Sequence, residues 1–245
     1  MTQRGIRALL GTKMDIIPKK LYAVITGDIV SSSKFPQNVR VKLHNEMVKG
    51  GETLRRIFPS VLPWSLEIFS GDSWQLVVSD PSLSLRIALF YRAFLRAQLE
   101  KFKVESRLAI AVGTIDFIPD DRISAGDGQA FQKSGRLLGK MPKHSRMIFG
   151  IAGRENSDIH LALEIVILLL DTLVQRWTAR QAQTVADVLR GWTREKIANN
   201  FLPKPISQQG VAQHLERAEW SAIEKGLIFF EHSLKNLSIS GNKKF

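Results

Sequence analysis

Residues 64–78 read WSLEIFSGDSWQLVV, and most of the fold prediction starts from them. Two strand-like segments, 64–69 and 73–78, flank Ser70-Gly71-Asp72, which is typical of a hairpin with a tight turn. Further upstream, residues 22–26 form a short apolar run that ends at Gly27-Asp28, as a buried strand ends at a turn. The sequence therefore predicts a sheet in which Asp28 and Asp72 stand at strand ends.

The segments around this hairpin alternate between helical and strand patterns. Asp80-Pro81 has the N-cap and first-position residues of a helix whose apolar positions continue at helical spacing. The other segments are a helix at 38–58, a strand at 107–112, a helix at 126–139 and a strand at 146–150. The order is β-α-β-β-α-β followed by an αβ unit, so we predict an α+β fold with a ferredoxin-like palm domain.

The pattern changes near residue 155, after which strand signals vanish. Helical candidates follow at 162–175, 179–190, 194–200 and 208–230. We predict a palm domain over residues 21–155 and an all-α helix-turn-helix domain over 156–245. Residues 1–20 are a basic extension, for which disorder is one interpretation.

Composition excludes several classes of protein. The chain has 245 residues and no Cys, which removes disulfide scaffolds, thiolate metal sites and Cys nucleophiles. Its longest apolar run, 165–170, is far shorter than the roughly 20 residues that span a bilayer, and no secretory signal precedes it. We therefore expect a cytoplasmic protein. The five His residues have no metal-ligand spacing, and the glycine-rich loops of P-loop and Rossmann proteins are absent.

The net charge of +12 is weaker support for nucleic-acid binding than its size implies. Residues 1–20, 21–165 and 166–245 each carry an excess of four positive charges. A basic excess favours polyanionic partners. One third of it lies in the N-terminal extension and another third is spread over the palm domain.

Asp28 and Asp72 are candidates for a metal site. If the two strand ends lie side by side, the carboxylates converge. With the backbone carbonyl of Ile29 they form an oxygen-rich site suited to Mg²⁺ or Mn²⁺, completed by nucleotide phosphates. The alternative is that each Asp only accepts backbone N–H bonds in its turn.

Three sequence blocks resemble the bacterial SatD family: ITGDIV at 25–30, SGDSWQ at 70–75, and GDGQAF at 126–131 followed by Ser134-Gly135-Arg136. The same blocks are similar to the palm domain of class III nucleotidyl cyclases. This resemblance implies that Asp28 and Asp72 match the metal carboxylates, Gly71 lies in the nucleotide-binding turn, and Arg136 addresses phosphate. Gln132 occupies the position of the family's Asn.

Two further positions depart from the cyclase pattern. Ile68 stands where adenylyl cyclases place the Lys that reads adenine, and Ser73 stands where diguanylate cyclases have an acidic residue. These departures imply altered base recognition. The structural alternative is that Gly27, Gly71 and Gly126 only make turns, with Arg136 paired to an acidic neighbour.

The C-terminal region has a helix-turn-helix pattern. Ile197, Val211 and Leu215 are spaced to pack two helices together, and Ser207 is the predicted N-cap of the second helix. The whole segment from Trp177 resembles the four-helix module of sigma-factor region 4, with Thr178 and Thr193 capping the two preceding helices. The predicted base-reading face comprises Gln208, Gln209, Gln213, His214 and Arg217.

Basic residues around this pattern are the predicted phosphate contacts: Arg180, Arg190, Arg194, Lys196 and Lys204. The alternative is a plain helical bundle. The leading hypothesis is a homodimeric DNA-binding transcriptional regulator whose palm domain senses a nucleotide or metal-nucleotide. The competing hypotheses are an active metal-dependent nucleotidyl cyclase, and an interaction module in which both sites have decayed.

Overall fold

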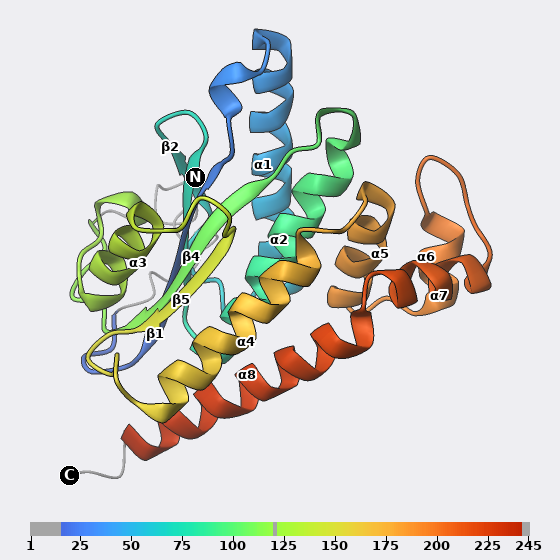
Figure 1. The fold of residues 1–245 in the computed structure, drawn as a ribbon. Helices are drawn as coiled ribbons and strands as arrows, with labels where there is room; N and C mark the ends of the chain where they lie inside the picture. The colour runs from blue at the N-terminus through green and yellow to red at the C-terminus, as the bar shows by residue number, and fades with distance from the viewer. Residues whose placement is uncertain (1–15, 120–121, 242–245) are drawn as a thin grey trace, which may run out of the picture.

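The computed structural model describes residues 16–119 and 122–241, so most of the basic extension at 1–20 lies outside the described residues (Figure 1). The strands are β1 (Tyr22–Ile29), β2 (Glu67–Phe69), β3 (Ser73–Val78), β4 (Ser106–Gly113) and β5 (Met147–Ile151). The α-helices are α1 (Gln37–Ile57), α2 (Ser84–Gln98), α3 (Gln129–Gly139), α4 (Asp158–Val174), α5 (Ala179–Leu189), α6 (Arg194–Asn200), α7 (Gln208–Arg217) and α8 (Trp220–Gly241). The chain is therefore a mixed α+β protein.

The strands form one five-stranded sheet in the order β2-β3-β1-β4-β5. The central strand β1 is antiparallel to both β3 and β4, and β4 is parallel to β5. In this register Asp28 lies opposite Arg107, and Gly27 lies opposite Trp74. The end of β1 is therefore placed beside a basic residue of its neighbour.

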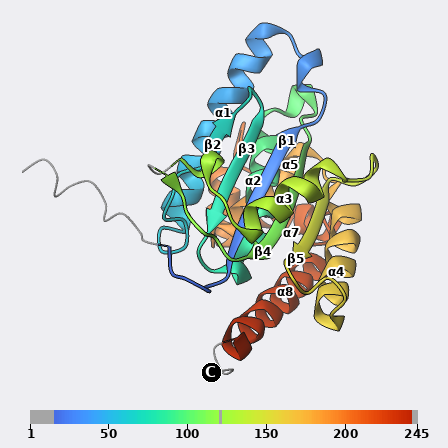
Figure 2. The ribbon, with the colours of Figure 1, turned by 90° about the vertical axis from the view of Figure 1, so that its left-hand side faces the viewer.

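Side chains of β1 alternate between the two faces of the sheet, as the two-residue period of a strand requires. Ala23 and Ile25 belong to the larger core with α1, α2, α4 and α8, whereas Tyr22 and Val24 belong to a smaller core with α3. Figure 2 shows α3 in front of the sheet and α2 behind it. The sheet is covered on both faces.

The C-terminal helices continue the larger core instead of forming a separate one. The helix α5 packs against α2, and α4 packs against β5 and α8. Phe149 of β5 meets Phe230 of α8 with ring centroids 5.3 Å apart. By contrast, α6 and α7 pack mainly on each other, α5 and α8, and they project from the body at the right of Figure 1.

Several element boundaries differ from the sequence prediction for local reasons. The predicted strand 64–69 is formed only at Glu67–Phe69, the residues that pair with Ser73–Gln75 of β3, and Trp64 lies in the smaller core with α3. The predicted helix 126–139 begins at Gln129, because Gly128 has a φ of 135°. The predicted helix 208–230 is interrupted at Glu219, whose φ of 55° separates α7 from α8.

The turn that leads into α2 is capped as the sequence predicts. Asp80 accepts the Ser82 N–H over 3.0 Å and starts a 3-10 turn that leads into α2, as its position before Pro81 predicts. Among the described helices, none has the length and apolar character needed to cross a membrane.

Candidate functional site

Asp28 and Asp72 line the same cavity, of about 280 Å³, at the C-terminal end of β1. The hairpin turn between β2 and β3 carries Asp72 to the end of the neighbouring strand, as the sequence predicts. The cavity is lined by Asp28, Ile29, Val30, Ser31, Asp72, Ser73, Arg107, Lys143 and Arg146. The two acidic residues therefore share the cavity with three basic residues.

Arg107 is bound to Asp28 by two parallel hydrogen bonds. Its Nε donates to Asp28 Oδ1 over 2.9 Å and its Nη2 donates to Oδ2 over 2.5 Å. The hydrogen bond with Asp28 raises the pKa of Arg107, and the charges of Asp28 and Asp72 act in the same direction. The guanidinium therefore lies in the field of both carboxylates.

These residues do not fit a site for Mg²⁺ or Mn²⁺ in the arrangement observed. A hard divalent cation is held by the negative charge of its carboxylate ligands, but the bidentate contact with Arg107 already neutralises Asp28. Within the described ranges no third His, Cys, Asp or Glu joins the pair to make a metal-binding group. A cation would also be repelled by the guanidinium.

Three cavity residues had not been singled out from the sequence: Arg107, Lys143 and Arg146. Arg107 is recognisable only once the register of β1 and β4 is known. Lys143 and Arg146 lie in the basic segment between α3 and β5, so the crossover brings them to the end of β1. Sequence spacing alone did not reveal this convergence.

Gly71 lines a second cavity, of about 490 Å³, on the other side of the hairpin turn. Gly71 has a φ of 84° and its neighbour Ser70 a φ of 49°, which suits the tight turn. Asp72 lines both cavities, and the second also contains Arg40 and His44 from α1. The turn thus separates two adjoining spaces.

Gln132 and Arg136 are exposed on α3 and line neither cavity. The Gln132 side chain donates to Asp127 Oδ1 over 3.1 Å, and Arg136 Nε donates to the backbone carbonyl of Gln132 over 3.2 Å. Within one chain they are therefore not brought together with Asp28 and Asp72. Arg136 is not paired with Asp127 or Asp116 through any described ion pair.

Three polar residues of the sequence blocks, Gln75, Thr26 and Ser134, form a buried hydrogen-bond network. Gln75 donates to Thr26 Oγ1 over 2.9 Å, and that hydroxyl lies 2.9 Å from the hydroxyl of Ser134 on α3. Ser134 in turn donates to the Phe131 carbonyl. This buried network ties α3 to β1 and β3, so part of the motif serves packing.

The second helix of the helix-turn-helix pattern is α7. Ser207 caps it by accepting the Gly210 N–H over 3.0 Å. Exposed polar residues with no side-chain hydrogen bond inside the described ranges follow on this helix: Gln208, Gln209, Gln213 and Arg217. Val211 and Leu215 are buried on its opposite face.

His214 does not share this exposed face. Its Nδ1 lies 3.1 Å from the Thr184 hydroxyl and its ring centroid 5.3 Å from that of Phe201. Burial lowers the pKa of His214, and the nearby charges of Arg180 and Arg217 lower it further. His214 therefore packs α7 against α5 and the loop that follows α6.

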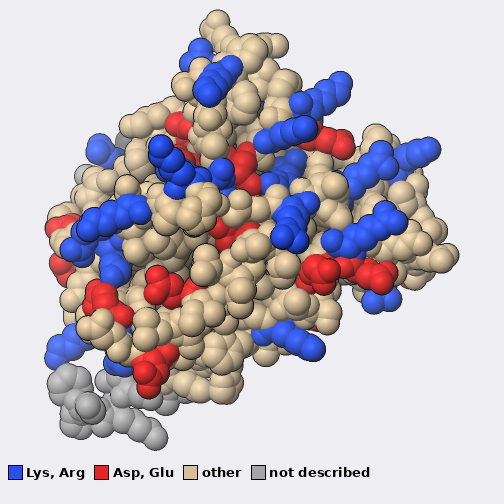
Figure 3. Space-filling model, viewed as in Figure 1, with Lys and Arg blue, Asp and Glu red and all other residues tan. Residues whose placement is uncertain are grey.

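Arg194 and Lys196 are both exposed on α6, which Thr193 caps by accepting the Lys196 N–H. The Trp192 ring lies beneath two cations, with Arg190 at 3.5 Å and Lys196 at 4.7 Å from its centroid. Figure 3 shows several Lys and Arg side chains along the upper edge of this projecting region, and Asp and Glu side chains below them with a further basic side chain beneath.

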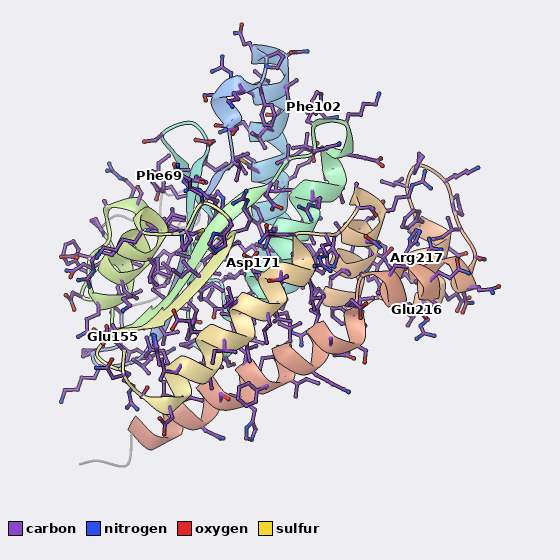
Figure 4. All side chains as sticks on the ribbon, viewed as in Figure 1. Phe69, Phe102, Glu155, Asp171, Glu216 and Arg217 are labelled. Atoms are coloured by element: carbon purple, nitrogen blue, oxygen red, sulfur yellow. The ribbon has the colours of Figure 1, made fainter. Side chains whose placement is uncertain are left out.

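A buried network of charged groups links the first cavity to the C-terminal helices. Asp171 of α4, labelled in Figure 4, accepts from the Arg146 backbone N–H and from Arg92 Nη1, both over 2.7 Å. Arg92 also donates to Glu105, which binds Arg96. Arg96 donates to the carbonyls of Val174, Gln175 and Trp177, just before α5. Because every step is a direct contact, the cavity wall and the start of α5 are physically connected.

Comparisons with known proteins assign neither a family nor an activity. No protein-family model matches the chain, and no curated protein matches it. One similar solved structure is that of a bacterial light-regulated adenylyl cyclase. The identity is 14%, the TM-score is 0.37, and the match covers 53% of this chain and 75% of that chain.

Proposed function

We propose that this protein is a DNA-binding regulator of the SatD type, in which α6 and α7 bind DNA and a palm-type domain senses a nucleotide. The observation that carries the proposal is the row of exposed side chains on α7: Gln208, Gln209, Gln213 and Arg217. These side chains are free of hydrogen bonds within the described part of the chain. Polar groups displayed in this way are available to a partner.

The chemistry of this row suits the major groove. Gln pairs bidentately with adenine and Arg with guanine, and helix-turn-helix proteins read bases with the N-terminal part of the second helix. The cap at Ser207 marks that N-terminus, and α7 is on the part of the molecule that projects from the sheet (Figure 1). Arg194 and Lys196 on α6 supply phosphate contacts.

The sensing role rests on the two cavities beside the hairpin turn, which together hold Asp72, Arg40, Lys143 and Arg146. The buried network from Arg146 to the carbonyls before α5 supplies a route between the cavity and the DNA-binding helices. We propose that ligand at the cavity changes the position of α5 and so changes DNA affinity. Saturating ligand that leaves DNA affinity unchanged would contradict this coupling.

A homodimer fits both parts of the proposal, because paired recognition helices match half-sites about one helical turn apart. An apolar face supports it: Leu161, Ile165, Leu168 and Leu169 are 47–60% exposed on α4. Figure 3 shows the surface over the middle of α4 and α8 as largely uncharged. The test is the molar mass in solution of the full chain and of Leu169→Glu, with Leu202→Glu as control, since Leu202 is equally exposed but lies outside this face.

The experiment for DNA binding starts with selection of duplexes from a random pool by the full-length protein, followed by affinity measurements on selected and scrambled duplexes. Gln209→Ala should weaken selected duplexes about tenfold while scrambled duplexes are unaffected. Arg194→Ala should weaken both alike and reduce the salt dependence. Gln129→Ala, an exposed Gln on α3, is the matched control. Failure to enrich any sequence, or equal losses from Gln209→Ala on both duplexes, would overturn base reading.

A metal-dependent nucleotidyl cyclase is the second candidate, since Asp28 and Asp72 line one cavity. The ion pair between Asp28 and Arg107 stands against it. Incubation with each of the four nucleoside triphosphates and Mn²⁺ tests it directly. A cyclic product that Asp72→Asn abolishes would establish the cyclase, and no product with any triphosphate would retire it.

A further inference from the structure

The arrangement at the end of β1 is a complete ion pair where the resemblance implies a metal site. Asp28 is one-fifth exposed and Arg107 about one-third exposed, so the pair is reachable from the cavity yet partly shielded from water. Bidentate pairing of Arg with a carboxylate has the best geometry and strength among such contacts. A divalent cation at the Asp28 oxygens would lie beside the fixed positive charge of Arg107, which repels it.

Asp72 is the second carboxylate in the cavity. Its side chain makes no hydrogen bond or ion pair among the described residues, and its charge raises the pKa of the Arg107 guanidinium. One fixed positive charge thus acts on both acidic side chains. This is the electrostatic role that a bound divalent cation has between two carboxylates.

The remaining basic side chains are available to an anion. After Asp28 and Arg107 neutralise each other, the cavity keeps two basic side chains and one acidic one. The Lys143 ammonium has no partner in the described ranges, and Arg146 uses only Nη1, on the carbonyls of Lys143 and Ser145. The side chains that line the cavity are therefore net positive without a metal.

We propose that Arg107 is a built-in cation at this site, so that the cavity excludes divalent metal and binds a phosphate-bearing ligand through Lys143 and Arg146 without one. The ligand half of this inference rests on the proposed nucleotide-sensing function. The metal half does not, because it concerns only the contacts of Asp28, Asp72 and Arg107.

The metal half is tested by titrating Mn²⁺ into the full chain and following the electron paramagnetic resonance signal of free Mn²⁺. The wild type should leave the signal unchanged at micromolar protein. Arg107→Met should bind Mn²⁺ at least about tenfold more tightly, because two carboxylates then face each other without a cation. Asp28→Asn in the Arg107→Met background should remove the gained binding.

Further variants test whether the gain in Mn²⁺ binding is specific to Arg107 or follows from the loss of any positive charge in the cavity. Lys143→Met removes a positive charge from the same cavity but no bond to Asp28, so it should not create a Mn²⁺ site. Arg107→Lys keeps the charge and should bind Mn²⁺ as weakly as the wild type. Arg107→Gln keeps a donor towards Asp28 but removes the charge, so it should gain Mn²⁺ binding even if Arg107→Met fails to fold. Micromolar Mn²⁺ binding by the wild type, or equal gains from Lys143→Met and Arg107→Met, would overturn the proposal.

The ligand half is tested by calorimetry with inorganic tripolyphosphate and with ATP, each in EDTA and in Mn²⁺. The wild type should bind equally in both buffers, and Lys143→Met should bind about tenfold more weakly. Binding that requires Mn²⁺ overturns the proposal. If neither tripolyphosphate nor ATP binds in either buffer, both the proposed phosphate site and the proposed nucleotide sensing are wrong. The Mn²⁺ titration then still tests whether Arg107 excludes a divalent metal.

Discussion

The cavity beside Asp28 and the exposed face of α7 differ in how their polar groups are satisfied. In the cavity, Asp28 and Arg107 hold each other, and the nearby Arg146 is tied through its backbone to buried Asp171. On α7, by contrast, Gln209 and Gln213 lie in solvent without a side-chain partner in the described chain. Asp28, Arg107 and Asp171 are satisfied within the protein, whereas the polar groups on α7 are left for a partner. Substitution of the paired residues should therefore affect stability, and substitution of the exposed α7 residues should affect binding.

The largest expected effect is the loss of Asp171. This carboxylate is 1% exposed and accepts from Arg92, Gln175 and the Arg146 backbone. Asp171→Ala leaves buried Arg92 with Glu105 as its single acidic partner and removes the acceptor of the Arg146 backbone N–H. It should lower the free energy of unfolding by about 3 kcal/mol. Urea denaturation measures it.

Glu164→Ala is the control for Asp171, since Glu164 is an exposed acid of the same helix. It should change the free energy of unfolding by less than about 0.5 kcal/mol. If Asp171→Ala lowers the free energy of unfolding no more than Glu164→Ala does, the contrast between the cavity region and the exposed face of α7 is wrong.

The next largest effects on stability are expected at two glycines, Gly27 in β1 and Gly135 in α3. A Cβ at Gly27 would come within 2.5 Å of the Trp74 ring and 2.7 Å of the Arg107 carbonyl. Gly27→Ala should therefore destabilise the protein by about 1–3 kcal/mol. Gly135 lies in α3 with nothing within 4 Å, so Gly135→Ala should stabilise it by about 0.5–1 kcal/mol. Thermal unfolding of both variants gives the signs, and two changes of the same sign would contradict the packing argument.

On α7, substitution of the cap should lower stability, whereas substitution of the exposed amides should not. Ser207→Ala removes the hydrogen bond to the Gly210 N–H and should cost about 1 kcal/mol of stability. Gln209→Ala and Gln213→Ala should each stay within about 0.5 kcal/mol of the wild type, because neither amide has a partner to lose. Denaturation midpoints test this. A large loss from either Gln variant would mean that the face is structural.

The smallest effect is a pH dependence from His214, whose pKa is lowered in the folded protein by burial and by two nearby Arg charges. Its contribution to stability is complete above the unfolded pKa of about 6.5 and is lost as pH falls towards the folded pKa. His160, whose pKa burial also lowers, contributes in the same direction. The unfolding free energy of His214→Gln should therefore fall less than that of the wild type between pH 7.5 and 5.5. Parallel pH profiles would contradict it.

Most of the element order could be predicted from the sequence, because local signals specified it. A short apolar run marks β1, and the strand-like segment after the Ser70-Gly71-Asp72 turn marks β3. The caps Asp80, Thr178, Thr193 and Ser207 are present in the structure. The errors occurred where backbone conformation overrides composition. The break at Glu219 has a positive φ on a residue that ordinarily favours helix, so no sequence pattern announced it.

The sites were predictable only in part, since sequence reasoning identified residue types but not partners. Asp28 and Asp72 share a cavity as expected, yet the pairing of Asp28 with Arg107 depends on strand register. His214 fits the helical spacing of the α7 face, but its ring meets Thr184, 30 positions earlier in the chain. Such long-range contacts leave no local pattern in the sequence.

The packing of α5 on α2 has a consequence for how the protein can be divided. A fragment that began at residue 156 would keep Asp171 but lose Arg92, and it would expose the side of α5 that α2 covers. A fragment that ended at residue 155 would leave Arg92 with Glu105 alone and would expose the side of α2 that α5 covers. The sheet and the C-terminal helices therefore share one unit of folding, so a cut at residue 155 should destabilise both parts of the chain.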